Sequence, residues 1–107
     1  MRAGRLTERI TVQRKSVARD AIGGETITWL DVAVVWAEQL SAAGREFVAL
    51  RQARAEVALG FRTRYFAGVN ATMRVLWGGT PYEVVEVIAA ARRSELRIYC
   101  RGEAQDA

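Results

Sequence analysis

The first part of the chain alternates between apolar and polar residues. Residues 9–14 place Ile10 and Val12 on one side and polar side chains on the other, which predicts a strand with one buried face. Residues 15–24 are polar and end in two glycines, so we predict a hairpin connection there. A second strand is expected to begin near Glu25.

The following segment is apolar on both faces. Residues 30–31 interrupt the alternation, which predicts a bulge or bend. The alternation then resumes over residues 32–40 as a long third strand, with Val34 and Trp36 on one side and Val35 on the other. A strand that is apolar on both sides is expected to be covered on both sides, as in a barrel.

Residues 45–57 change to helical spacing. The apolar positions that recur are Phe47, Leu50, Ala53 and Val57. Glu46 falls in the first turn and Arg51 and Arg54 fall in the last turns, where each charge suits the helix dipole. We therefore predict one helix, which begins after the break at residues 41–44.

Four more strands are predicted after the helix. They cover residues 57–66, 73–77, 82–88 and 96–101. The two glycines at residues 78–79 indicate a tight hairpin. The predicted fold is mainly β, a small antiparallel β-barrel or rolled sheet of about six or seven strands with one α-helix.

Size and composition suit a single domain over residues 1–107, with an ordered core over residues 6–101 and a frayed tail over residues 102–107. Half of the 107 residues are hydrophobic and 26% are charged, which is typical of a globular protein. No apolar run approaches the ~18 residues that a membrane span needs. No apolar stretch follows Arg2 and Arg5, so we expect no secretory signal.

Several kinds of chemistry are excluded by composition. The chain has no histidine and its single cysteine is Cys100, so one chain holds neither a His/Cys zinc site nor a Ser-His-Asp triad. Glu83 and Glu86 are three residues apart in a predicted strand and point to opposite faces. We therefore expect no catalytic residue, no metal and no cofactor, and the protein is predicted not to be an enzyme.

The positive charge leaves two interpretations open. The net charge is +4, and 15 of the 16 basic residues are arginine, with Lys15 the exception. The arginines either form solvated faces or contact an acidic partner such as nucleic acid. Basic residues interleave with aromatic ones around residues 62–65 and 97–101, a pattern that can bind single strands. Against this, Trp29, Trp36 and Trp77 fall on apolar strand faces, which predicts that they belong to the core.

A series of short motifs runs through residues 6–101. In order they are the strand at residues 9–14, Asp20, Gly23-Gly24-Glu25, Thr28-Trp29, Val35-Trp36-Ala37, Ser41, Gly44-Arg45-Glu46, Gln52, residues 62–65, residues 73–75, Gly79 and residues 82–84. Their order and spacing resemble those of the phage head-tail joining proteins, also called head completion, stopper or head-tail connector proteins. The sequence departs from that pattern at residues 66–67 and 76–77, which are more apolar.

The resemblance implies a structural role in a tailed phage or a phage-derived particle. It implies a homo-oligomeric ring of about 12 or about 6 copies in the neck of the virion, assembled in the host cytoplasm. The ring would lie below the portal and adaptor proteins, join the head to tail or tail-terminator proteins, and retain packaged double-stranded DNA without sequence specificity. We expect no membrane among its partners. The alternative is a stand-alone small-barrel protein that binds nucleic acid.

The resemblance also points to particular residues. The segment at residues 41–56 lies toward the channel in the family, which implies that Arg45, Arg51 and Arg54 face DNA. A ring needs a head-to-tail interface between copies. We expect Val32, Val35 and Phe47 to contribute to that interface.

Overall fold

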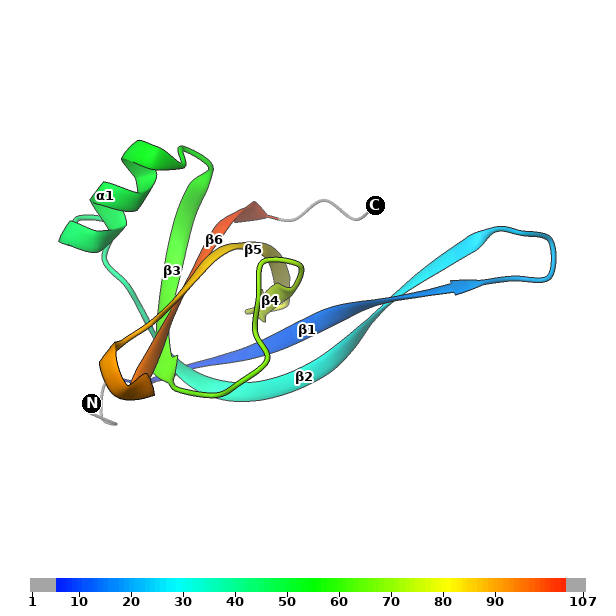
Figure 1. The fold of residues 1–107 in the computed structure, drawn as a ribbon, viewed down its shortest axis with the longest axis horizontal. Helices are drawn as coiled ribbons and strands as arrows, with labels where there is room; N and C mark the ends of the chain where they lie inside the picture. Colours follow the sequence, from blue (N-terminus) through cyan, green and yellow to red (C-terminus); the bar gives the residue numbers. More distant parts are fainter. Residues whose placement is uncertain (1–5, 104–107) are drawn as a thin grey trace.

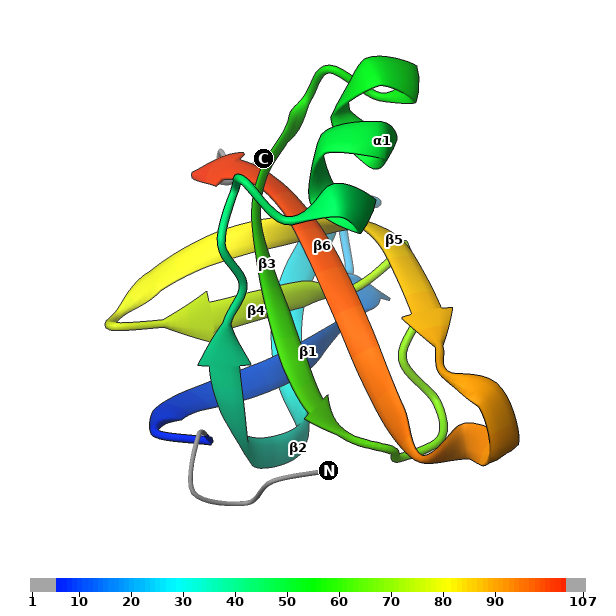
Figure 2. The same cartoon turned by 90° about the vertical axis from the view of Figure 1, so that its left-hand side faces the viewer.

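The structure, a computed structural model, describes residues 6–103 and consists of six antiparallel strands that close on themselves, with one α-helix outside (Figures 1 and 2). The elements are β1 (Glu8–Arg19), β2 (Glu25–Gln39), α1 (Arg45–Ala53), β3 (Val57–Arg64), β4 (Arg74–Trp77), β5 (Thr80–Ala89), the 3-10 helix η2 (Ala91–Arg93) and β6 (Glu95–Glu103). The strand order is β1-β2-β3-β6-β5-β4, and β4 also pairs with β1. The predicted fold class is confirmed.

The inward-facing residues of all six strands form the main core. They are Ile10, Val12, Ala37, Phe61, Val75, Val84, Leu96, Ile98 and Cys100, each at most 3% exposed. The Phe61 and Trp77 rings meet edge to face, with centroids 5.3 Å apart. These residues alternate with outward-facing ones along each strand, so the period-2 pattern of the sequence identifies most of this core.

A second, smaller core lies between α1 and the outside of the barrel. Phe47 of α1 packs there with Val57, Val85 and Tyr99, which come from β3, β5 and β6. The helix ends at Ala53, earlier than the predicted end at residue 57, because Val57 already pairs with β6 as the first residue of β3. Helix α1 therefore covers the β3-β6-β5 side of the barrel and leaves the β2 side open.

The connection between β1 and β2 is shorter than predicted. Strand β1 continues to Arg19, and only residues 20–24 form the turn. The Asp20 carboxylate accepts hydrogen bonds from the backbone N–H groups of Ile22 and Gly24, at 3.0 and 2.7 Å. Gly23 takes a positive φ of 85°, which suits glycine. Residues 15–19 thus belong to a two-stranded ribbon. Solvent reaches both faces of this ribbon, which explains why the segment carries few apolar residues.

The predicted second and third strands are one strand, β2. A bulge is present, one residue later than expected: Val12 pairs with Ala33 and Gln13 with Asp31, so Val32 is the extra residue. The expectation that residues 32–40 are covered on both sides is wrong. Ala37 is fully buried, but Val34 and Trp36 on the opposite face are 48% and 51% exposed, because α1 packs elsewhere.

The tryptophans are only partly in the core. Trp77 packs against the main core, as predicted. Trp36 is half exposed, with the Arg9 guanidinium 4.9 Å from its ring centroid. Trp29 lies under the Arg74 guanidinium, 4.3 Å away. The two β2 tryptophans therefore lie on the outside of the sheet, since the two faces of β2 cannot both point inward.

The two ends of the chain lie largely outside the described residues. Strand β6 extends to Glu103, so it includes residues 102–103 of the predicted tail. The rest of the predicted tail, residues 104–107, and most of the N-terminal segment, residues 1–5, are outside the described part. Within residues 6–103, no helix is long and apolar enough to cross a membrane.

Candidate functional site

The N-terminal end of α1 is fixed to β6 by Glu46. The Tyr99 hydroxyl donates a hydrogen bond to Glu46 Oε1, and Arg97 Nη1 lies 3.2 Å from Glu46 Oε2. The Phe47 ring meets the Tyr99 ring edge to face, with centroids 5.6 Å apart. Burial, followed by the hydrogen bond to Glu46, raises the pKa of Tyr99 well above its usual range. Tyr99 therefore remains a neutral donor that holds the helix in place.

The C-terminal end of α1 is fixed by Arg54. Its Nη1 donates to the Val85 carbonyl oxygen at 3.2 Å, and the guanidinium forms ion pairs with Glu56 and Glu86 at 3.3 and 3.5 Å. Of the three arginines expected to face DNA, Arg54 is thus occupied by contacts within the chain. Two carboxylates offset its charge.

Arg45 and Arg51 remain on the open surface of the helix. Both are exposed, and neither forms an ion pair with any described residue. Val48, between them, is 41% exposed. The helix therefore presents two positive charges outward, on a backbone that Glu46 and Arg54 anchor at either end.

Arg62 and Arg97, two of the arginines interleaved with aromatic residues, form ion pairs within the chain and are not free to bind nucleic acid. Arg62 lies 2.8 Å from Glu38 and 3.4 Å from Glu95, and Arg97 lies 3.1 Å from Glu95. Tyr99, the aromatic residue between Arg97 and Arg101, is 1% exposed and so has no free ring face for a base. This network ties β2, β3 and β6 together, so it does not offer a free stacking surface for single strands.

The three residues expected at a subunit interface are not brought together. Val32 is 38% exposed on the outside of β2. Val35 packs against the main core, and Phe47 is 2% exposed in the core under α1. Val34 and Trp36 alternate with buried or half-buried residues along the same strand and are exposed as Val32 is; we call these three the β2 stripe. The sequence marked this stripe as apolar, but it could not show which face α1 would leave uncovered.

A two-stranded arm projects from the barrel (Figure 1). Strand β4 pairs with β1 only over Ile10–Gln13, and β3 pairs with β2 only over Ala37–Gln39. Residues 14–30 therefore pair only with one another, and we call them the arm. The molecule measures 50 × 28 × 26 Å as a result. At the arm's tip Ile22 is 92% exposed, which is unusual for a large apolar residue in a turn that is otherwise polar.

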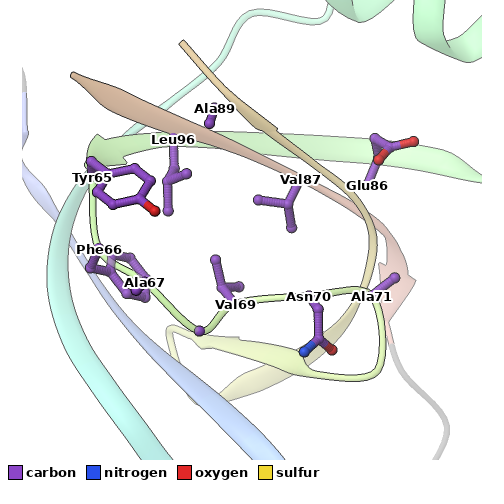
Figure 3. A pocket seen from close by; sticks show the side chains of 11 residues that line it. Tyr65, Phe66, Ala67, Val69, Asn70, Ala71, Glu86, Val87, Ala89 and Leu96 are labelled. Atoms are coloured by element: carbon purple, nitrogen blue, oxygen red, sulfur yellow. The ribbon is translucent and has the colours of Figure 1, made fainter. Parts of the chain in front are cut away.

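Pockets open at two places on the described part of the barrel. Figure 3 shows one of about 350 Å³ between the loop at residues 65–71 and β5, where Tyr65, Val69, Val87 and Leu96 turn toward the same space. The other, which we call the end pocket, has a volume of about 200 Å³. It is lined by Leu6, Val35, Trp36, Arg64, Tyr65 and Phe66.

Neither pocket gathers groups suited to catalysis. Glu86 is the one ionisable carboxylate among the lining residues, and it lies at the edge of the first pocket. The Cys100 thiol is fully buried, and burial raises its pKa to about 12, so it is a poor nucleophile. Among residues 6–103, no three His, Cys, Asp or Glu side chains are grouped so that they could hold a metal ion. The surfaces are apolar or basic, which suits binding to macromolecules.

The comparison with protein families gives a match to the phage head completion proteins over residues 1–103. The chain belongs to this family. The resemblance inferred from its motifs is therefore confirmed. Head completion proteins are structural components of virus particles, and this member is accordingly a structural virion protein.

The solved structures that share this fold include the following two. The solution structure of protein SF1141 from Shigella flexneri 2a is 30% identical, with a TM-score of 0.73, and the match covers 94% of this chain and 96% of that one. A chain from the virion of a native gene transfer agent particle is 19% identical, with a TM-score of 0.62 and the same coverage. The second likeness shows the fold alone. A comparison with curated protein sequences finds no significant match.

Proposed function

We propose that this head completion protein forms a homo-oligomeric ring in the neck of a phage or phage-derived particle. The ring joins the DNA-filled head to the tail and retains the packaged DNA. Its neighbours are the portal or adaptor proteins on the head side and tail or tail-terminator proteins on the other, and it assembles in the host cytoplasm. The family match over residues 1–103 is the observation that carries this proposal.

The uncovered apolar surface supports assembly with other chains. Val32, Val34 and Trp36 are each between 38% and 51% exposed on one strand face. From Glu25 to Trp36, β2 pairs on one side only, with β1, and leaves its other edge open. Open edges and exposed apolar stripes are features that proteins normally cover, and a ring covers them with the next copy.

The charge on α1 supports a position beside DNA. Duplex DNA carries one negative charge per ~1.7 Å of its axis, so a ring that repeats exposed arginines around a channel places many cations near phosphates. Arg45 and Arg51 are exposed for such contacts, whereas Arg54 is held by Val85 and Glu86. Contacts of this kind require no base recognition, which suits a channel that passes any sequence.

The proposal is tested with particles produced without this protein. We expect heads that lose their DNA and lack tails, seen by electron microscopy, and recovery when the wild-type chain is supplied. Full, tailed and infectious or DNA-transferring particles formed in its absence would contradict the proposal.

The channel assignment has a separate test. The Arg45→Gln/Arg51→Gln variant should join heads to tails normally but lose packaged DNA several-fold faster, because two phosphate contacts per copy are removed. The matched control is Arg92→Gln/Arg93→Gln, which removes the same charge from the exposed turn before β6. Equal DNA retention in the two variants would place α1 away from the channel.

The alternative function, a stand-alone nucleic-acid binder, has one supporting observation, the net charge of +4. It predicts that the isolated chain binds DNA or RNA with an affinity that falls steeply with salt. We expect no measurable binding by the isolated chain at 150 mM salt, because Arg54, Arg62 and Arg97 are engaged in ion pairs within it.

A further inference from the structure

The arm and the end pocket lie at opposite ends of the molecule. In the β1–β2 ladder, Glu8 pairs with Ala37 at one end and Arg19 with Glu25 at the other. Ala37 in turn pairs with Thr63, so Arg64, Trp36 and the start of β1 gather at the barrel end away from the arm (Figure 1). The 12 residues of β1 span about 37 Å. The tip of one copy therefore cannot reach its own end pocket.

The tip and the pocket are complementary in shape and polarity. Ile22 is a branched apolar side chain with 92% of its surface exposed. The end pocket of about 200 Å³ is walled by Leu6, Val35 and the rings of Trp36 and Phe66. A cavity of about 150 Å³ with apolar walls holds a group as large as benzene, so the end pocket has room for one isoleucine side chain.

Their charges are complementary as well. Residues 19–25 hold one basic residue, Arg19, and two acidic ones, Asp20 and Glu25, which gives a net charge of 1 − 2 = −1. The rim of the end pocket carries Arg64, and Arg9 lies over the outer face of Trp36. The acidic tip fits a basic rim, whereas it would be repelled by the phosphates of DNA.

We propose that Ile22 at the tip of each arm inserts into the end pocket of the next copy in the ring. This inference rests on the proposed function, since it names the contact that links copies of the chain. Because tip and pocket are different surfaces at opposite ends, the contact is head-to-tail, and repetition around a closing rotation gives a ring. The contact also stabilises the arm, since an isolated two-stranded ribbon is only marginally stable in water.

The test is a cross-link between copies in assembled particles. Thr7 is exposed and lines the mouth of the hollow next to the end pocket, beside Leu6, Trp36 and Arg64. In the Ile22→Cys/Thr7→Cys variant each copy carries one thiol at the tip and one at the pocket. Treatment with a short bifunctional thiol reagent should give a ladder of covalent multimers on a denaturing gel. The native Cys100 does not compete, because it is fully buried.

The single variants are the controls. Particles that contain only Ile22→Cys, or only Thr7→Cys, should give no cross-linked product, and mixed particles with both single variants should give mainly dimers. Dimers formed by Ile22→Cys alone would show that arms meet one another, which overturns the proposal.

Two failures can be distinguished. If the double variant is incorporated into tailed particles but gives no covalent multimers, the proposed arm contact is wrong and the proposed function in the neck is unaffected. If the wild-type chain is absent from tailed particles, the proposed function fails and this inference fails with it.

A second variant tests the contact without cross-linking. Ile22→Asp should lower the yield of tailed particles at least tenfold, whereas Ile22→Val should retain it, and both should fold because the side chain is exposed. Normal yields from Ile22→Asp would overturn the proposal.

Discussion

Gly60 lies where the barrel closely approaches the residues that hold α1. A Cβ atom at this position would lie 2.8 and 2.9 Å from two ring carbons of Tyr99 and 3.3 Å from Leu40 Cδ1. Tyr99 cannot move aside freely, because its ring packs against Phe47 and its hydroxyl is bonded to Glu46. The glycine is required here for space, since it is not at a positive φ.

We predict that Gly60→Ala lowers the free energy of unfolding by about 1–3 kcal/mol, as overpacking of a core does. The measurement is urea unfolding followed by tryptophan fluorescence. Gly102→Ala is the matched control, because nothing lies within 4 Å of a Cβ there. An equal effect of the two substitutions would show that Tyr99 is not fixed.

Two buried groups make stability depend on alkaline pH. Burial raises the pKa of the Cys100 thiol to about 12 from its ordinary value of 9.0. The unfolded chain therefore loses this proton at lower pH than the folded chain does, so the stabilisation is complete below pH 9 and is lost as pH rises toward 12. The pKa of Tyr99 is raised as well, which adds a loss that begins near pH 10.

We predict that the free energy of unfolding falls by about 3–4 kcal/mol between pH 8 and pH 11. Cys100→Ala should show a smaller fall, because only Tyr99 then contributes. Thiol-reagent kinetics provide an independent check: at pH 9 the native chain should react far more slowly than the urea-unfolded chain. A rapid native reaction would contradict the burial of Cys100.

At the scale of elements, the sequence predicts regular strands better than it predicts which surfaces are covered. Alternation identifies the strands around Ile10, Phe61 and Ile98, and the paired glycines at residues 78–79 identify the β4–β5 hairpin, because each signal is local. The exposure of Trp36 depends on where α1 packs. That is decided by the contacts that Glu46 and Phe47 make with Tyr99, which is more than 50 residues away in the sequence. Local pattern contains no such information.

The arm could not be predicted from the sequence for a similar reason. Residues 15–19 are polar on one face and have few apolar neighbours, so they look like a loop although they are a strand. Their pairing with residues 25–29 is set by the Asp20–Gly24 turn and by the continuous β1–β2 ladder. Ile22 is the one feature of the turn that the proposed contact between copies would explain, because its apolar side chain is 92% exposed there.

The arm should be the least stable element of the isolated chain. Its residues pair only with each other, while the barrel strands pair on two sides. We predict that backbone amides at Val17 and Ile27 exchange with solvent at least a hundredfold faster than those at Phe61 and Ile98, measured by hydrogen exchange with NMR. Uniform protection along β1 and β2 would contradict this prediction.

At the scale of the whole molecule, the arm makes the chain longer than a compact domain. The radius of gyration of the Cα atoms is 14.8 Å, against about 13 Å for a compact chain of this length. The extra length lies in the arm, beyond the positions where β4 and β3 pair with it.

We predict that the arm can be shortened without loss of the barrel. Replacement of residues 16–28 by Asn-Gly joins Lys15 to Trp29, which are paired in the ladder, and keeps Trp29 beside Arg74. Small-angle scattering should give a radius of gyration about 2 Å smaller than that of the wild type, with an unchanged circular dichroism spectrum in the near ultraviolet. An unfolded variant would show that the arm is part of the folding core.

The continuity of the arm with β1 and β2 has a mechanical consequence. A force applied at the tip is transmitted along both strands to the barrel, where the β1–β4 and β2–β3 pairings bear it. The hydrogen bonds of antiparallel ladders are perpendicular to their strands, so this tension loads them sideways and all at once instead of peeling them one by one. A neck built from such subunits would resist the internal pressure of a filled capsid by sharing the strain among many bonds.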